Sequence, residues 1–395
     1  MVEWWAPFIT LFVCSMTIAL LTTPLARRVA WRVGAVDKPS ARRINCHPIP
    51  RMGGIAIFLA IFGGILIESL LGHAFGWPRL LMEEGPFGNR YDYPRIGLGV
   101  FLIFLTGLID DLVTLTPKQK LLGQILGTCV TVSGGLTIDV IVNPLSNDGI
   151  DLGWLTFPIT VVYLVAYTNI FNLIDGLDGL AAGIACIASV TMWVVSTMAG
   201  RLDAAALSLV LAGATLGFLR YNFNPASIFM GDSGSLLIGF VLGSISLMSV
   251  QRIAGLTSII IPLVIAGIPI IDTFSAIVRR GRAHVSIGQA DKGHIHHRLM
   301  EEGFNQRQTV LFIYAWTTVL CMGSILMTQV TVLPRIAIFC ILIASSIIFA
   351  MRLHLFQPVL LHHYNPETGA DELVAPQDPA FAEEAQKFEE EHPLF

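Results

Sequence analysis

The sequence has 395 residues, of which 54% are hydrophobic and only 13% are charged. An ordinary soluble domain carries about a quarter charged residues, and the mean hydropathy of this chain is +0.70. A water-soluble globule could not cover this composition with polar side chains, so a soluble enzyme and a disordered scaffold are disfavoured. The formal net charge of −4 offers no basic surface to a nucleic acid. The composition predicts an integral membrane protein.

Eleven apolar runs are candidates for membrane-spanning helices, because a bilayer core needs about 20 apolar residues per crossing. They predict an all-α polytopic membrane protein whose membrane domain covers residues 1–351. With the N-terminus outside, 18 of the 24 basic residues lie on the inner side, which places the C-terminus in the cytoplasm. The runs cover roughly residues 4–26, 53–72, 95–113, 121–142, 156–173, 179–199, 204–220, 233–250, 256–277, 308–328 and 333–351.

Two segments depart from this apolar pattern. Residues 136–155 alternate apolar and polar side chains around Asn147-Asp148-Gly149, which predicts a small extracytoplasmic β-hairpin. Residues 352–395 form an acidic tail, with nine acids and one base, Lys387, from about residue 365 onward. We expect this tail to be a solvated, weakly ordered and weakly helical extension in the cytoplasm, without a catalytic role.

Six carboxylates lie at or near the cytoplasmic ends of the predicted spans, where an ionisable group is costly and functional by default. Two of them, Asp110 and Asp111, are adjacent, so they repel each other unless they share a cation. Mg²⁺ together with a substrate phosphate suits such oxygen ligands, whereas a solvated helix end is the simpler alternative. The six are Asp110, Asp111, Asp175, Asp178, Asp232 and Asp272.

The segment from Asn169 to Ala181 places several amides and carboxylates, with two glycines, between two apolar runs. Glycine lets the backbone approach a ligand closely, so this segment predicts a binding site rather than a simple connection. Asp232 follows Phe229-Met230-Gly231 and precedes a new helix. The free N–H groups of that helix could hold an anionic phosphate through a metal, while an ordinary N-cap is the alternative.

The basic loop 278–307 contains a second group of polar residues. Its three arginines, at 279, 280 and 282, are interpreted as positive-inside anchors. Three histidines follow at 294, 296 and 297, but no cysteine or fourth ligand accompanies them, and two are adjacent, which argues against zinc. Hydrogen bonding to a diphosphate or sugar fits them better, with Arg298 as a bidentate phosphate ligand.

Together these segments resemble the polyprenyl-phosphate N-acetylhexosamine-1-phosphate transferases. The resemblance runs from about His47-Pro-Ile-Pro-Arg51-Met-Gly-Gly to Arg298, and the eleven spans extend it to about residue 351; the acidic tail is not covered. It implies that a polyprenyl phosphate, undecaprenyl in a bacterium, attacks a UDP-sugar to give polyprenyl-diphospho-sugar and UMP. It also implies a requirement for Mg²⁺, with Mn²⁺ as a substitute, and a multi-pass protein of the inner membrane with its active site on the cytoplasmic face.

The resemblance also implies roles for individual residues. Asp175 and Asp232 would hold Mg²⁺ on the diphosphate, and Phe229 would stack on uracil. The amide and carboxylate group Asn172, Asp178 and Asn222 would position the nucleotide and the metal shell. Diphosphate or sugar would be bound by His294, His296, His297 and Arg298. The lipid phosphate would face Asp110 and Asp111, with Lys120 steering it.

Two departures from the lipid I translocases bear on the sugar. The histidine run is interrupted as His294-Ile-His-His-Arg298, and the acidic pair continues as Leu112-Val-Thr114 without a lysine. Both favour a UDP-N-acetylhexosamine, with UDP-GlcNAc as the default, over a muramoyl-pentapeptide donor. That translocase is the alternative within the class, and a secondary transporter is the rival from another class. The expected partners are both substrates, the bilayer and a second copy of the chain as a homodimer.

Overall fold

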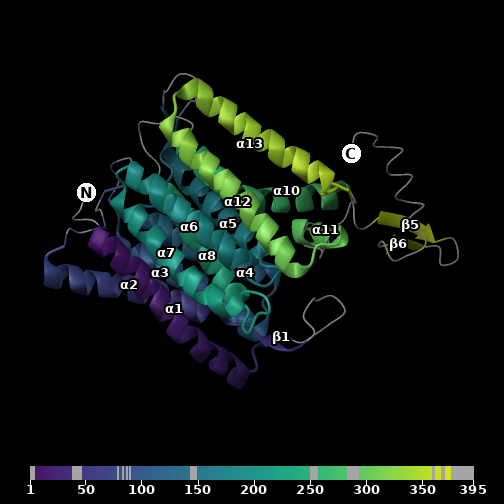
Figure 1. The fold of residues 1–395 in the computed structure, drawn as a ribbon, viewed down its shortest axis with the longest axis horizontal. Coiled ribbons are helices and arrows are strands. Elements are labelled where there is room, and N and C mark those ends of the chain that lie inside the picture. Colours follow the sequence, from purple (N-terminus) through teal and green to yellow (C-terminus); the bar gives the residue numbers. More distant parts are fainter. Residues whose placement is uncertain are drawn as a thin grey trace.

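A computed structural model of the protein describes residues 5–37, 47–77, 80–81, 84–85, 88, 90–142, 149–249, 257–282, 293–357, 361–365 and 370–374. The described chain is a bundle of helices with short strand pairs at its ends (Figure 1). It is an all-α polytopic membrane protein. The helices are α1 (Trp5–Val33), α2 (Gly54–Phe75), α3 (Tyr93–Val113), α4 (Pro117–Ser133), α5 (Thr156–Ile174), α6 (Leu180–Met198), α7 (Leu202–Asn222), α8 (Gly231–Met248), α9 (Thr257–Ile265), α10 (Gly267–Arg282), α11 (Ile295–Glu301), α12 (Gln306–Gln329) and α13 (Val332–Arg352).

The helices follow the apolar runs because a backbone in lipid must satisfy its hydrogen bonds within its own segment. Local side chains fix where two of them begin. Thr116 and Gln119 form a reciprocal capping box at α4, and Asn305 and Gln308 form another at α12. Each box satisfies two backbone donors that the first turn leaves unpaired.

The centre of the bundle is formed by α6, α7 and α8. Buried residues make up 67%, 78% and 89% of their apolar windows, against 6% for the peripheral α13. Close contact between α1 and α7 depends on small residues. A Cβ at Gly213 or Gly217 would lie 2.4–2.5 Å from a backbone carbonyl oxygen of α1, so only glycine permits this approach.

Nine helices of the described chain are long and apolar enough to cross a membrane, two fewer than the eleven predicted spans. The predicted span 121–142 is shortened, because α4 ends at Ser133 before Gly134-Gly135 and has only 17 residues. The predicted span 256–277 is divided into α9 and α10 at Ala266. Pro269 has no N–H for the carbonyl four residues earlier, which disfavours one continuous helix there.

The predicted hairpin is present as antiparallel strands β3 (Val140–Val142) and β4 (Gly149–Asp151), while its extracytoplasmic side stays a prediction. Its turn, residues 143–148, lies outside the described residues. The helical expectation for the start of the acidic tail is wrong, because β5 (Leu361–Asn365) pairs antiparallel with β6 (Ala370–Val374). A proline and a glycine lie between these strands in the sequence, and both residue types interrupt helices. The tail beyond residue 374 lies outside the described residues.

A third strand pair shapes the end of the bundle where the predicted site residues lie. β1 (Val36–Asp37) pairs antiparallel with β2 (Ile49–Pro50). The next residue, Arg51, then forms a parallel bridge with Phe229. The segment after α1 is thereby joined to the segment that precedes α8.

Candidate active site

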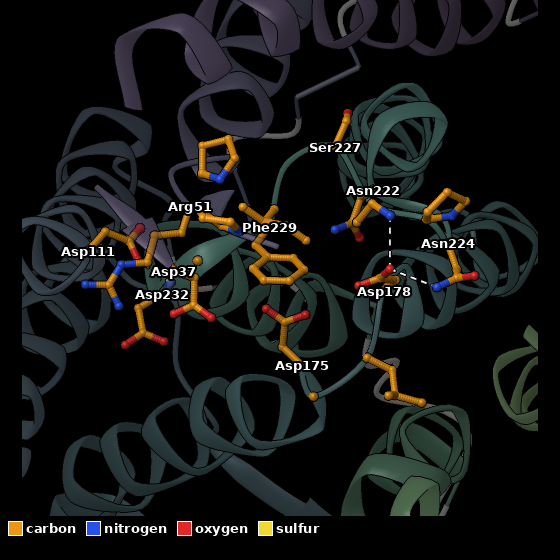
Figure 2. Close-up of a pocket in the computed structure, with 18 of the residues that line it drawn as sticks. Asp37, Arg51, Asp111, Asp175, Asp178, Asn222, Asn224, Ser227, Phe229 and Asp232 are labelled. Atoms are coloured by element: carbon orange, nitrogen blue, oxygen red, sulfur yellow. Dashed lines mark hydrogen bonds between the residues drawn. The ribbon is translucent and has the colours of Figure 1, made fainter. Parts of the chain in front are cut away.

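A cavity of about 1260 Å³ opens at the end of the bundle where α1, α3, α5 and α7 finish and α8 begins. Four of the six predicted carboxylates line it, together with Asp37, which the sequence analysis did not single out. Phe229 lies near the middle of the cavity, between the group formed by Asp111 and Asp232 and the group formed by Asp178 and Asn224 (Figure 2). The helix termini thus bring together residues separated by more than a hundred positions.

Asp111 caps helix α8. Its carboxylate accepts hydrogen bonds from the backbone N–H groups of Asp232 (2.9 Å) and Ser233 (3.1 Å), and from the Ser233 hydroxyl (2.6 Å). Gly231 has a φ of +71°, and a Cβ there would lie 2.5 Å from an Asp111 oxygen. The expectation that these N–H groups are free for a phosphate is therefore wrong, because Asp111 already occupies them.

Asp232 is held by a lysine and an amide. Lys120 Nζ lies 2.5 Å from its Oδ2, and Asn172 Nδ2 donates to its Oδ1 at 2.7 Å. The same Lys120 lies 3.4 Å from Asp110 Oδ2 and donates to Asn172 Oδ1 at 3.3 Å. Asn172 also donates to Ser235 Oγ at 2.8 Å. Four predicted site residues therefore form one network, in which Lys120 neutralises two carboxylates behind the cavity wall.

Asp175 differs from its neighbours because its carboxylate has no hydrogen bond or ion pair to any described residue. It follows the last residue of α5, lines the cavity and points toward the Phe229 ring (Figure 2). Burial raises the pKa of Asp175 to about 8, and the nearby charges of Asp232, Asp111 and Asp178 add to the effect. A bound cation would reverse this shift by favouring the ionised form.

The oxygen ligands in the cavity suit a partly open Mg²⁺ site better than a metal site made of protein ligands alone. No group of three histidine, cysteine, aspartate or glutamate side chains in the described chain is arranged to hold a metal alone. Asp175 and Asp232 offer two carboxylates in one cavity. Mg²⁺ characteristically uses one or two carboxylates and completes its shell with substrate phosphates and water. The residues present therefore suit a magnesium ion that is shared with a phosphorylated substrate.

Asp178 and Asn222 shape the loop that carries Phe229. Asp178 Oδ2 accepts hydrogen bonds from Asn224 Nδ2 at 3.0 Å and from the Ala226 N–H at 2.9 Å (Figure 2). Asn222 is 3% exposed, accepts from the Gly179 N–H and donates to the Ile228 carbonyl. These contacts indicate that both side chains act through the loop geometry.

The backbone of Phe229 is fixed on its other side. Its N–H donates to the Pro50 carbonyl at 2.8 Å, and its carbonyl accepts from the Gly53 N–H at 3.0 Å. The half-buried Phe229 ring thus lines the cavity from a segment whose backbone is fixed by hydrogen bonds on both sides. Such a ring is suited to stacking on a planar ligand.

All three predicted histidines line the cavity. His294 Nδ1 lies 2.9 Å from Asp272 Oδ2, and the Ile295 N–H donates to the other Asp272 oxygen at 2.7 Å. The His296 ring stacks on His294 with an interplanar angle of 4°, and its buried Nδ1 has no hydrogen-bond partner among the described residues. Burial and the neighbouring His297 lower the pKa of His296 to about 3. His296 is therefore neutral near pH 7.

The expected role of Arg298 is not supported by its position, because it does not line the cavity. Its guanidinium lies 3.3 Å from Glu301 and donates to the Gln357 carbonyl at 3.4 Å. Arg282 donates to the Phe356 carbonyl at 3.2 Å. Arg279, interpreted from the sequence as a positive-inside anchor, is 1% exposed and donates to the Leu355 carbonyl, so its side chain also has a structural role inside the protein. Three arginines thus bind consecutive carbonyls beyond α13.

Besides Asp37, two residues that the fold brings to this site were not assigned a role from the sequence. Asp272 was noted as a carboxylate without a role, yet it fixes His294 and the start of α11. Arg51 was noted only as part of a motif, yet its side chain lines the cavity. The sequence feature that could have indicated Arg51 is its position between Pro50 and the glycine pair at 53 and 54. The backbone N–H groups of these glycines donate to the carbonyls of Phe229 and Met230.

The fold and the site define a polytopic membrane protein with an acidic, amide-rich cavity at one end of its bundle. Residues 93–250, from α3 to just beyond α8, match the model of glycosyl transferase family 4. Over 338 residues the chain is 39% identical to a protein of Bacillus subtilis named "Probable undecaprenyl-phosphate N-acetylglucosaminyl 1-phosphate transferase", with 85% of this chain and 90% of the relative covered.

Two further relatives show the breadth of the similarity. A decaprenyl-phosphate N-acetylglucosaminephosphotransferase of Mycolicibacterium smegmatis is 36% identical, with 80% of this chain and 82% of the relative covered. A phospho-N-acetylmuramoyl-pentapeptide-transferase of Halalkalibacterium halodurans is 31% identical, with 68% and 79% covered. The chain therefore belongs to glycosyl transferase family 4, as the resemblance of its motifs predicted.

Proposed function

We propose that the protein transfers N-acetylglucosamine 1-phosphate from UDP-GlcNAc to a polyprenyl phosphate, undecaprenyl phosphate in particular. The products are polyprenyl-diphospho-N-acetylglucosamine and UMP, the starting point of a cell-envelope polysaccharide. The observation that carries the proposal is the cavity itself, which brings together three groups at the end of a membrane bundle. They are the carboxylate of Asp175, which pairs with no described residue, the fixed carboxylate of Asp232 and the ring of Phe229. The relatives' names agree with it.

Asp175 and Asp232 are the proposed ligands of Mg²⁺, for which Mn²⁺ could substitute. Bound there, the cation would neutralise charge on the diphosphate. Lys120 and Asn172 fix the orientation of the Asp232 carboxylate, so its ligating oxygens need little rearrangement when the substrate arrives. In the same proposal Phe229 stacks on uracil, and His294, His296 and His297 contact the diphosphate or the sugar.

The acceptor needs no strong base. A phosphate monoester has a second pKa of about 6, so it is largely a dianion near neutral pH. Phosphoryl transfer depends mainly on positioning and charge neutralisation. We therefore assign Asp110 and Asp111 to holding the site together near the acceptor. This follows from their contacts, since Asp111 caps α8 and Asp110 pairs with Lys120.

We further propose that the cavity lies on the cytoplasmic face of the inner membrane. Arg27, Arg28 and Arg32 line its rim at the end of α1, as positive-inside residues would. A UDP-sugar would then arrive from the cytoplasm and the lipid phosphate from the bilayer. The clustering of carboxylates at one end of the bundle argues against a transporter, whose charged residues lie nearer the midplane. A homodimer is a further proposal, testable by the mass of the detergent-solubilised protein.

The test is a reconstituted reaction. Purified protein, Mg²⁺ and undecaprenyl phosphate are mixed in turn with UDP-GlcNAc, UDP-GalNAc and UDP-MurNAc-pentapeptide, and UMP release and the lipid product are measured. We expect UMP and a diphospho-lipid with UDP-GlcNAc, no turnover after chelation with EDTA, and recovery with Mg²⁺ or Mn²⁺. Turnover with UDP-MurNAc-pentapeptide alone would instead establish the lipid I reaction, which the 31% identical relative makes the second candidate.

A further inference from the structure

Arg51 is held at the wall of the cavity by its backbone. Its N–H donates to the Ala35 carbonyl at 2.9 Å, and the residue bridges Phe229 in parallel. The side chain therefore starts from a fixed point rather than from a loop tip. It lines the cavity and lies on the same side as Asp111 and Asp232 (Figure 2).

The guanidinium of Arg51 has no hydrogen bond or ion pair to any residue that the structure describes, and its Nε is buried without a partner. A guanidinium carries five N–H donors, and leaving a buried donor unpaired is costly. The carboxylates nearby are already engaged. Asp111 accepts three hydrogen bonds from α8, and Asp232 is bound by Lys120 and Asn172.

The other cations near the site are used elsewhere or lie at its rim. Lys120 is paired with Asp110 and Asp232 behind the cavity wall, and Arg298 is paired with Glu301 outside it. The three α1 arginines that line the cavity are exposed to solvent. Among the described residues, Arg51 is thus the partly buried cation that lines the cavity with its donors unused.

The proposed reaction brings a phosphate monoester and a diphosphate into a cavity that already contains five carboxylates. The two positive charges of one magnesium ion would not balance the negative charges of these carboxylates and of the substrate phosphates. Arginine is suited to the remaining task, because its planar fork binds two phosphate oxygens at once. A donor fixed in advance at the reacting centre also stabilises the charge of the transition state.

We propose that Arg51 is a ligand of a substrate phosphate at the reacting centre. The inference rests on the proposed function and adds to it a residue to which the resemblance gave no role. The shared chemistry is a phosphate oxyanion. Its source is either the acceptor monoester or the donor diphosphate, and kinetics with each substrate distinguishes the two.

The experiment compares Arg51→Gln, Arg51→Lys and the control Arg220→Gln. Arg220 is exposed at the end of α7 and does not line the cavity, so its replacement removes the same charge elsewhere. UMP release gives kcat and KM for each substrate, and thermal unfolding monitors the fold. We expect Arg51→Gln to lower kcat/KM by on the order of 10- to 100-fold, as for a lost charged hydrogen bond. Arg51→Lys should recover part of the loss, and Arg220→Gln should match the wild type.

The thermal midpoint should be unchanged in Arg51→Gln, because the Arg51 side chain makes no hydrogen bond or ion pair to a described residue. A higher KM for undecaprenyl phosphate identifies the acceptor phosphate as the ligand, and a higher KM for UDP-GlcNAc identifies the donor. A fall confined to kcat places the contact in the transition state. The proposal is refuted if Arg51→Gln stays within twofold of the wild type, or if Arg51→Lys is no better than Arg51→Gln.

Failure of the proposed function would look different. In that case the wild-type protein itself would release no UMP with any UDP-sugar. Equilibrium binding of UDP and of undecaprenyl phosphate to the wild type and to Arg51→Gln then tests the residue alone. Weaker binding of either compound to the variant supports the phosphate contact, and equal binding of both refutes it.

Discussion

Replacing Asp111 by asparagine should destabilise the protein as well as inactivate it. The aspartate is 2% exposed and accepts three hydrogen bonds from the first turn of α8. An asparagine has one oxygen acceptor, and its amide group would meet backbone donors. The substitution therefore removes the negative charge from a helix N-terminus and leaves at least one buried donor without an acceptor.

The expected loss can be estimated from these contacts. Hydrogen bonds to a charged group contribute about 1.5–3 kcal/mol, against about 0.5–1.5 kcal/mol for neutral ones. A charge at a partly buried helix terminus contributes up to about 2 kcal/mol. Repulsion between Asp111 and Asp232 offsets part of both contributions. We expect Asp111→Asn to lower the free energy of unfolding by about 2–4 kcal/mol.

The assay is denaturant or thermal unfolding in detergent micelles, paired with UMP release. Asp175→Asn is the matched control, because the Asp175 carboxylate lines the same cavity without a hydrogen-bond partner in the described part of the chain. This control should lose activity and also the stabilisation that added Mg²⁺ gives the wild type. Without the cation, it should be at least as stable as the wild type, since one repelling charge has been removed. If Asp111→Asn kept wild-type stability, the capping role would be wrong and Asp111 would serve the substrate directly.

Three further outcomes follow from other contacts. Gly176→Ala would place a Cβ 2.5 Å from a His296 ring atom, so kcat/KM in the UMP assay should fall at least tenfold. In the control Gly281→Ala the new Cβ meets nothing within 4 Å, so kcat/KM should not change. Because burial lowers the pKa of His296 to about 3, only the unfolded chain takes up a proton on this group between about pH 3 and 6.5. The free energy of unfolding therefore decreases as the pH is lowered from about 6.5 to 3. Unfolding curves should show that the free energy of unfolding of His296→Gln depends less on pH, by up to about 1.4 kcal/mol per pH unit. A chain that ends at Arg352 lacks the carbonyls bound by three arginines, so it should unfold at a lower temperature and be inactive. A chain that ends at Gln357 should keep the wild-type unfolding temperature and activity. Equal behaviour of the two chains would contradict this role of the carbonyls.

The sequence predicts much of the bundle because apolar length alone identifies a helix in lipid. It cannot tell where a helix is interrupted by packing. The division between α9 and α10 falls beside Gly267 and Pro269, whereas α9 continues past Pro262 and α1 continues past Pro24. A proline in a membrane helix is tolerated when neighbouring groups compensate for the lost hydrogen bond. That compensation is a property of the folded bundle.

The sequence predicted which residue types form the candidate site, but not which contacts each residue makes. Asp110 and Asp111 look equivalent in the sequence, yet adjacent residues on a helix point about 100° apart. One side chain therefore meets Lys120, and the other meets the start of α8. Arg298 was expected at a phosphate, but its guanidinium meets the Gln357 carbonyl, 59 positions later. A contact over that distance leaves no local pattern in the sequence.

The binding of α10 and α11 to the chain beyond α13 sets an order on the protein's folding. Arg279, Arg282 and Arg298 bind the carbonyls of residues 355–357, which the ribosome makes after every helix of the described bundle. Until that short stretch emerges, the segment with the cavity's histidines is held by Asp272 but lacks the contact between Arg298 and the Gln357 carbonyl. The complete set of contacts around α10 and α11 therefore forms only after the last helix has been made.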